Sequence, residues 1–213
     1  MHPISKTLAQ HYSEKFALHG PSPEGVDWGS DESKILLRYD KMLRVADHVN
    51  RSNPSLLDAG CGYGGLRQYA FSKNIDLDYT GIDVAGNMIE WAKANVASGD
   101  FIHGDILDYK FQRTFDYVVC NGILTQKLGT VGLEMDQFAA QIIRRLFSLC
   151  TVGMAFNVMT TKVNYYSNNL YYRNPVELFA WCLSEISSDI RLDHSYPLYE
   201  YTIYLYRTSA SQA

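Results

Sequence analysis

Three features are missing from the sequence, and each absence excludes a class of protein. The longest stretch without a charged residue, 146–161, has 16 residues, whereas a membrane-spanning helix needs roughly 20 mostly apolar ones. The first residues, Met1–Lys6, lack the apolar segment of a secretory signal peptide. The 19 lysines and arginines, set against 23 acidic residues, gather in no basic segment, unlike those of a nucleic-acid-binding protein. We therefore predict a cytoplasmic protein that binds neither membranes nor nucleic acid.

Closely spaced cysteines are missing as well. The four cysteines lie 59, 30 and 32 positions apart, at Cys61, Cys120, Cys150 and Cys182. Zinc and redox motifs place their cysteines only a few positions apart. A chain of 213 residues also needs no disulfides to hold a core together. We therefore predict no metal site and four buried free thiols.

The composition is that of an ordinary globular domain, with 46% hydrophobic and 20% charged residues. Apolar runs predict strands at Ser55–Ala59, Asp78–Asp83, Asp100–His103, Thr114–Cys120 and Val152–Met159. Apolar residues three and four positions apart predict helices at Ser5–Leu18, after Ser30 as N-cap, and at Gly65–Ser72, Asn87–Val96, Leu133–Leu149 and Pro175–Ile186. This alternation predicts one α/β domain over residues 1–213, with a mostly parallel sheet between two layers of helices.

The chain ends differently. Two further strands are predicted at Asp189–Ser195 and Glu200–Arg207, and only a short connection around Pro197 joins them. Such a connection allows only an antiparallel hairpin. The expected architecture is therefore a Rossmann-like three-layer sandwich whose sheet has seven strands, with an antiparallel hairpin strand at its C-terminal end.

The strongest local pattern is a glycine-rich turn after the first predicted strand, Asp58-Ala59-Gly60-Cys61-Gly62-Tyr63-Gly64-Gly65. Glycines at such a place allow a tight turn and let a ligand approach the main chain closely. Gly60, Gly62 and Gly65 fit the dinucleotide fingerprint, so an NAD-dependent oxidoreductase is one interpretation.

Two acidic residues follow the next two predicted strands. Asp83 ends the second strand, where a carboxylate can accept two hydrogen bonds from a ribose diol. Asp105 follows the third strand, where it can accept a hydrogen bond from an adenine amino group. The two acids together favour a cofactor that contains adenosine.

With these residues, the sequence from 54 to 207 resembles the class I S-adenosylmethionine-dependent methyltransferases. In that family the sheet ends in an antiparallel strand pair like the hairpin predicted here, which an NAD-binding domain does not predict. The resemblance implies S-adenosylmethionine as cofactor and S-adenosylhomocysteine as product. It also implies that residues 53–213 form the cofactor-binding core.

The resemblance assigns a role to each residue of the motifs. In the stretch that begins at Asp58, the glycines Gly60, Gly62 and Gly64 would lie at the methionine end of the cofactor, and Asp83 would bind the ribose hydroxyls.

The remaining motif residues follow the second, third and fourth strands. Met88 would pack on the adenine, Asp105 would accept from its amino group, and the amide of Ile106 would donate to the ring. Asn121 would face the methionine moiety.

The N-terminal residues 1–52 are similar to the helical lid of a bacterial subgroup of these enzymes. In that interpretation Trp28 belongs to the lid, and Arg38 holds the cofactor carboxylate through a charge-assisted contact. A core tryptophan and a solvated arginine are the alternative.

The predicted function is methyl transfer to a small-molecule acceptor. Relatives that methylate exocyclic amines carry two prolines after the fourth strand, whereas this chain has Asn121-Gly122-Ile123-Leu124. The tyrosine-rich segment Thr160–Asn174 is expected to line an acceptor pocket. No catalytic base is assigned, because methyl transfer depends mainly on alignment. A cofactor-binding but catalytically silent subunit, or a macromolecular substrate reached through a partner, also fits the sequence.

Overall fold

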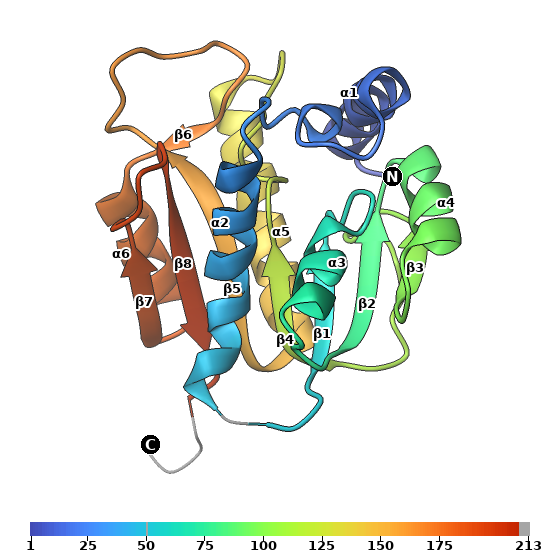
Figure 1. Ribbon diagram of the computed structural model, residues 1–213. Helices are drawn as coiled ribbons and strands as arrows, with labels where there is room; N and C mark the ends of the chain where they lie inside the picture. Colours follow the sequence, from blue (N-terminus) through green and yellow to red (C-terminus); the bar gives the residue numbers. More distant parts are fainter. Residues whose placement is uncertain (50, 209–213) are drawn as a thin grey trace.

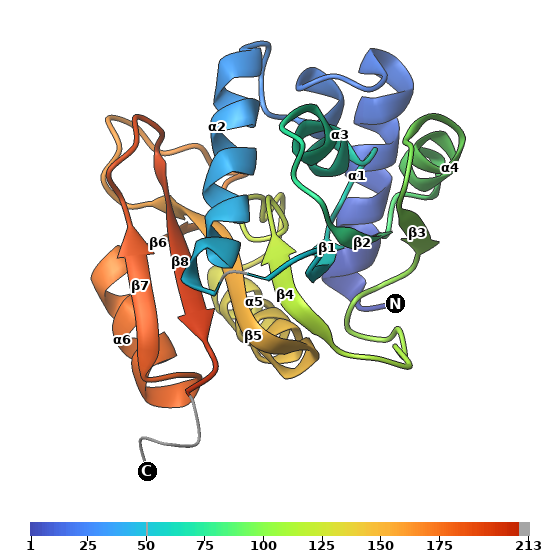
Figure 2. The ribbon, with the colours of Figure 1, turned by 60° about the horizontal axis from the view of Figure 1, so that its bottom comes forward.

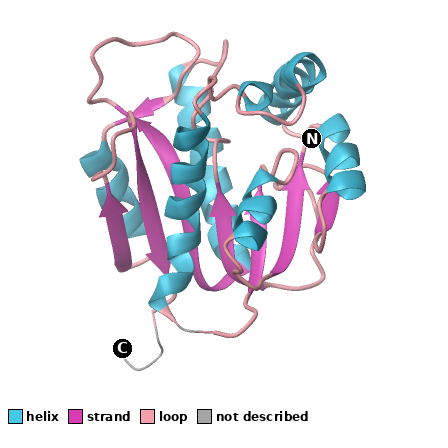
Figure 3. Ribbon diagram, viewed as in Figure 1, coloured by secondary structure: helices cyan, strands magenta, loops and turns pink. Residues whose placement is uncertain are grey.

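Eight strands form a single sheet with helices on both faces (Figure 1, Figure 3). The computed structural model describes residues 1–49 and 51–208. The strands are β1 (Ser55–Ala59), β2 (Asp78–Asp83), β3 (Asp100–His103), β4 (Phe115–Cys120), β5 (Cys150–Thr160), β6 (Tyr172–Arg173), β7 (Asp189–Asp193) and β8 (Glu200–Tyr206). The helices are α1 (Pro3–His19), η1 (Glu24–Val26), α2 (Glu32–Leu43), η2 (Arg44–His48), α3 (Gly65–Ser72), α4 (Gly86–Asn95), α5 (Gly132–Leu149) and α6 (Pro175–Glu185).

The strand order is β3-β2-β1-β4-β5-β8-β7, and β6 pairs with β5 beside this path. Strands β1 to β5 run parallel to one another, whereas β8 runs antiparallel to both β5 and β7. The mostly parallel sheet and its antiparallel terminal hairpin are therefore confirmed. Seven of the strands were expected from the sequence, and the two-residue β6 is an addition.

Alternate side chains along each strand enter two separate cores. Leu57, Val118 and Phe156 pack on one face of the sheet with α1, α5 and α6. Leu56 and Tyr117 pack on the other face with α2, α3 and α4. The turned view shows α2 and α3 on the opposite side of the sheet from α5 (Figure 2). The alternation of strand side chains thus produces the three layers.

The starts of α2 and α6 follow capping rules, with one correction to the sequence prediction. The side chain of Asp31, and not of Ser30, caps α2 by accepting a hydrogen bond from the Ser33 amide at 3.1 Å. Asn174 caps α6 in the same way, with Pro175 in the first turn. Ser30 and Asp31 are both good caps, so sequence preference alone does not decide between neighbours.

Helix α2 is fastened to the terminal hairpin by buried polar contacts. The Lys41 ammonium lies 2.7 Å from a carboxylate oxygen of Asp193, which ends β7. The Tyr204 hydroxyl donates to the main-chain oxygen of Lys41 at 2.8 Å. These contacts hold α2 across the face of β8.

All four cysteines are buried free thiols, as expected. None of the helices in the described ranges is long and apolar enough to cross a membrane.

Candidate active site

A cavity lies where the carboxyl ends of β1, β2 and β4 meet, and helix α1 extends across this edge of the sheet (Figure 1). The empty space in it is about 880 Å³, including the part open to solvent. Most residues that the sequence analysis assigned to cofactor binding line it, namely Trp28, Asp58, Gly60, Gly62, Asp83, Met88, Asp105, Ile106 and Asn121. Gly64 and Arg38 do not line it, although Arg38 packs on Trp28, which does.

The glycine loop has backbone angles that favour glycine. Gly60, Gly62 and Gly64 have φ values of 76°, 55° and 82°, in the left-handed region. A Cβ atom on Gly60 would lie 2.7 Å from Ile123, and one on Gly64 would lie 3.0 Å from the ring of Phe101. Gly64 therefore serves the turn into α3, whereas Gly60 and Gly62 expose main chain to the cavity.

Asp83 is fixed by the main chain at the end of β2. Its two carboxylate oxygens accept hydrogen bonds from the amides of Gly62 and Ala85, both at 2.8 Å. Burial nevertheless raises the pKa of Asp83 above its usual value, because these bonds offset only part of the desolvation. A further donor such as a ribose hydroxyl would stabilise the ionised form.

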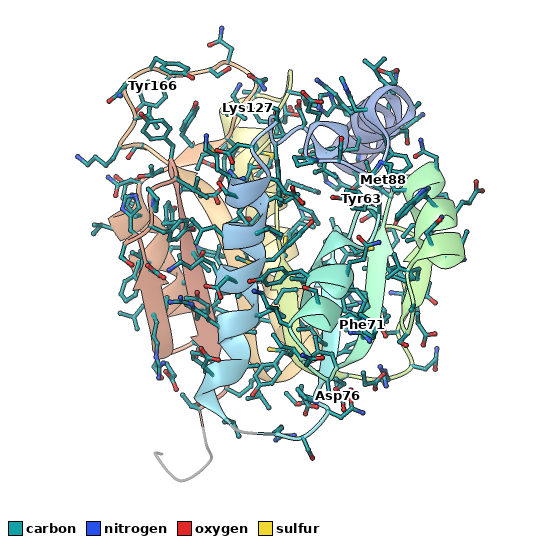
Figure 4. All side chains as sticks on the ribbon, viewed as in Figure 1. Tyr63, Phe71, Asp76, Met88, Lys127 and Tyr166 are labelled. Atoms are coloured by element: carbon teal, nitrogen blue, oxygen red, sulfur yellow. The ribbon has the colours of Figure 1, made fainter. Side chains whose placement is uncertain are left out.

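Asp105 is held from two sides at the other end of the cavity. One oxygen accepts from the Leu107 amide at 3.0 Å, and the other accepts from the His2 amide at 2.8 Å. The N-terminal end of α1 thus lies directly against the residue expected to bind adenine. Met88, which is buried, and Tyr63 belong to one small apolar cluster beneath α1 (Figure 4).

Two polar side chains at the carboxyl ends of β1 and β4 have atoms without a hydrogen-bond partner. Asp58 is 2% exposed, and only one of its oxygens has a partner, the Tyr79 hydroxyl at 2.7 Å. Asn121 is 8% exposed, and neither atom of its amide makes a hydrogen bond. Burial raises the pKa of Asp58 to about 7. An unsatisfied buried polar group costs about 1–3 kcal/mol, so these atoms favour a polar ligand.

Trp28 closes the cavity beside Asn121. Its ring packs on Gly122, where a Cβ atom would lie 2.8 Å from the indole. The guanidinium of Arg38 lies over the same ring, 4.7 Å from its centroid. The expected alternative of a solvated arginine is wrong, because the Arg38 side chain is only 13% exposed and its Nε lies 2.8 Å from Glu200.

Glu200 links Arg38 to Gly122 through the side chain of Asn157. It accepts from the Asn157 amide nitrogen at 3.3 Å, while the Asn157 oxygen accepts from the Gly122 amide at 2.9 Å. Burial raises the pKa of Glu200, and the Arg38 charge opposes that rise. The Nη1 of Arg38 is buried without a hydrogen-bond partner.

The charges around the cavity are of one sign. The described residues that line it include three carboxylates, Asp58, Asp83 and Asp105, and no lysine, arginine or histidine. Such a lining attracts a cation and repels the pyrophosphate of a dinucleotide. The NAD interpretation of the glycine loop is therefore disfavoured by the side chains that surround it.

Comparison with known proteins identifies the family. A methyltransferase-domain model matches residues 56–146. The Mycobacterium tuberculosis protein named "Putative methyltransferase Rv1506c" is 34% identical over 167 residues, which cover 76% of this chain and 98% of that protein. The chain belongs to the class I S-adenosylmethionine-dependent methyltransferases.

Solved methyltransferases share the fold. Magnesium protoporphyrin IX methyltransferase from Synechocystis PCC 6803, with bound S-adenosylmethionine, aligns with a TM-score of 0.67 and 14% identity, over 98% of this chain and 99% of that one. The plantazolicin methyltransferase BpumL, in complex with a pentazolic desmethylPZN analog and S-adenosylhomocysteine, aligns with a TM-score of 0.59 and 12% identity, over 98% of this chain and 100% of that one. The Rossmann-like architecture is confirmed.

Several lining residues of this methyltransferase were not predicted from its sequence. Ser5, Leu8 and Tyr12 of α1 line the cavity, as does Tyr39 of α2. A Cβ atom on Gly65 would lie 2.1 Å from the Tyr39 hydroxyl oxygen, so the last glycine of the loop makes room for this tyrosine. The three- and four-residue spacing of the α1 residues was the available signal.

The tyrosine-rich segment lies apart from this cavity. A second, open groove of about 1150 Å³ is lined by Lys127, Tyr166, Tyr171, Tyr172 and other residues, none shared with the first cavity (Figure 4). Tyr165, which was expected to line an acceptor pocket, is 74% exposed and does not line the groove.

Proposed function

We propose that this enzyme transfers the methyl group of S-adenosylmethionine to a small-molecule acceptor by in-line displacement. The unpartnered Asp58 and Asn121 atoms beside the glycine loop carry the proposal. The amino-acid end of S-adenosylmethionine would supply an ammonium group for the free Asp58 oxygen and a carboxylate for the Asn121 side-chain nitrogen. The three carboxylates suit a ligand that is cationic at sulfur.

The remaining residues divide the cofactor between them. The ribose hydroxyls would donate to Asp83, and the adenine would lie between Met88 and Ile106 with its amino group toward Asp105. In this arrangement the main chain of Gly60 and Gly62 lies beside the methionine portion, while their amides donate to Ile82 and Asp83. Arg38 would act behind Trp28, with its free Nη1 available to the cofactor carboxylate if the indole shifts.

When bound, the cofactor supplies an electrophilic methyl group on a positively charged sulfur. The chain contributes alignment and exclusion of water. A lone pair of the acceptor forms the new bond to carbon while the carbon–sulfur bond breaks and its electron pair stays on sulfur. No described lining residue is a histidine or lysine, the three lining carboxylates are assigned to the cofactor, and they repel an anion. We therefore expect an uncharged acceptor whose nucleophile already carries a free lone pair at neutral pH.

A small-molecule acceptor is favoured by the walls around the methionine end. Tyr12, Val26, Trp28 and Ile123 make these walls largely apolar, which suits a small organic body. The two solved relatives described above are named for small-molecule or peptide-derived substrates, magnesium protoporphyrin IX and plantazolicin.

Calorimetric titration with S-adenosylmethionine, S-adenosylhomocysteine and NAD tests the cofactor part of the proposal. Micromolar binding of the two adenosyl ligands and none of NAD is expected. A screen with labelled methyl donor then tests transfer to carboxylate, amine and thiol compounds. Tight cofactor binding with no transfer to any compound would favour the silent-subunit interpretation.

A further inference from the structure

Asp27 lies at the junction of three segments that surround the cavity. Its carboxylate oxygens lie 2.9 Å from His11 Nε2 and 3.0 Å from the Lys15 ammonium, and one of them accepts a hydrogen bond from the Gln126 side-chain amide at 3.0 Å. The Asp27 side chain is 22% exposed, so these contacts are partly shielded from water. No role in the methyl-transfer site was assigned to this residue above.

The contacts of Asp27 join parts of the chain that are distant in sequence. His11 and Lys15 belong to α1, Asp27 directly follows η1, and Gln126 lies in the loop between β4 and α5. Gln126 is buried, and its oxygen accepts from the Asn169 amide at 3.0 Å. The carboxylate of Asp27 therefore links α1 and η1 to the loop between β4 and α5.

The neighbours of these residues are walls of the cavity. Tyr12 follows His11, and Trp28 follows Asp27; both line the cavity. A shift of Asp27 would thus move two aromatic walls together.

Helix α1 is also attached at its N-terminal end, where the His2 amide donates to Asp105, and by apolar packing. Its buried residues are Ile4, Ser5, Leu8 and Phe16, and the Asn87 side chain donates to the Ser13 oxygen at 3.0 Å. Because α1 supplies cavity walls from Ser5 to Tyr12, its position affects how widely the cavity opens to solvent. Outward movement of α1 and η1 together would widen the exit for a bound ligand.

We propose that Asp27 is a positioning residue that fastens α1 and Trp28 over the bound cofactor and thereby sets the cofactor's residence time. This inference rests on the proposed cofactor-binding mode. Asp27 adopts a left-handed conformation with φ of 58°, which asparagine tolerates well. Asp27→Asn therefore removes the charge while it retains the backbone.

The test compares Asp27→Asn with Glu185→Gln, which removes an exposed ion pair with Arg144 between α5 and α6. Two quantities are measured, the dissociation rate of S-adenosylhomocysteine by stopped-flow tryptophan fluorescence and amide hydrogen exchange of residues 3–19 in the ligand-free protein. Asp27→Asn should raise the dissociation rate by about tenfold, as expected for weakened charged hydrogen bonds. It should also speed exchange in α1 alone, and Glu185→Gln should change neither quantity.

A second variant keeps the proposal falsifiable if Asp27→Asn folds poorly. Gln126→Glu places a carboxylate opposite Asp27 and should produce the same two changes. Wild-type rates in both variants would overturn the proposal, and so would faster exchange spread evenly over the whole chain. If the wild-type enzyme bound no adenosyl ligand, the proposed cofactor-binding mode would fail, whereas the exchange measurement would still test the attachment of α1.

Discussion

The acidity of Asp58 links cofactor binding to pH. Burial raises the pKa of Asp58 to about 7, the Tyr79 hydroxyl opposes that rise, and the nearby Asp83 charge adds to it. The free oxygen of Asp58 is the one proposed to receive the cofactor's ammonium group. Only the ionised carboxylate makes that contact with full strength. Cofactor binding should therefore strengthen as the pH rises through 7.

The size of the effect follows from the fraction of Asp58 that is ionised. With a pKa of about 7, roughly one molecule in eleven carries the charge at pH 6, and roughly ten in eleven carry it at pH 8. If the ionised form alone binds the ammonium, the Kd of S-adenosylhomocysteine should fall about tenfold between these values. Binding of the ligand near pH 6 should also release a proton from Asp58 to the solvent.

The stability of the ligand-free enzyme should change in the opposite direction. The folded-state pKa of Asp58 lies above its unfolded value, so this group favours the folded state most below pH 4. That contribution is lost as the pH rises toward 7, at about 1.4 kcal/mol for each pH unit. Opposite slopes for ligand binding and for unfolding would identify a buried carboxylate that serves a cationic ligand.

Calorimetry at pH 6, 7 and 8 measures the binding side, with 5′-methylthioadenosine as the matched ligand that lacks the amino-acid portion. Its affinity should be nearly constant, and Asp58→Asn should abolish the pH dependence for S-adenosylhomocysteine. Equal pH dependence for both ligands would refute the reasoning and would point to Asp83, whose pKa burial also raises.

Four further expectations concern single residues. Asp83→Ala should weaken S-adenosylhomocysteine and 5′-methylthioadenosine alike, by about 1.5–3 kcal/mol for each charged hydrogen bond lost, and unchanged calorimetric affinity would contradict its ribose role. Gly65→Ala should cost about 1–3 kcal/mol of stability in denaturant unfolding, because its Cβ would meet the Tyr39 hydroxyl at 2.1 Å, and Tyr39→Phe should restore part of the loss. Burial alone would raise the pKa of Asp193, but the bonds from Lys41 and Ser195 lower it to about 2; the stability due to this group is therefore present above pH 4 and lost toward pH 2. Lys41→Met should flatten that acid limb of a thermal-unfolding profile. Saturation with S-adenosylhomocysteine should change Trp28 fluorescence in a variant without Trp91 and Trp181, and a constant signal would place Trp28 away from the ligand.

The sheet was predictable because its signals are local. Strand β1 ends in the glycine turn, β2 ends at Asp83, and both have the predicted bounds. A strand that is buried on both faces consists of apolar residues, so it can be recognised from its own sequence without knowledge of the strands that pair with it. Strand β6 was missed because its two residues, Tyr172 and Arg173, pair only with the end of β5 and carry no pattern of their own.

The candidate site was predictable where main chain and strand ends create it, and not where a distant element covers it. The glycines and acids that line the cavity follow directly from the order of the strands. The partner of Arg38 is Glu200, and the first residues of α1 reach Asp105. Both contacts depend on how helices cross the sheet, which neither residue type nor spacing specifies.

The same arrangement relates ligand binding to stability. Asp58 and Glu200 are buried and Asp83 is half-buried, and desolvation raises the pKa of all three. Ionising these carboxyl groups therefore costs more in the ligand-free fold than in water. Asp58 and Asn121 add unpartnered atoms at the same end of the cavity. A ligand with donors for these groups recovers hydrogen bonds that folding gave up, and its binding free energy adds to the stability of the folded state. The unpartnered atoms that favour a polar ligand are therefore also atoms that make the ligand-free enzyme less stable, so Asp58→Asn should raise stability at neutral pH while it weakens binding.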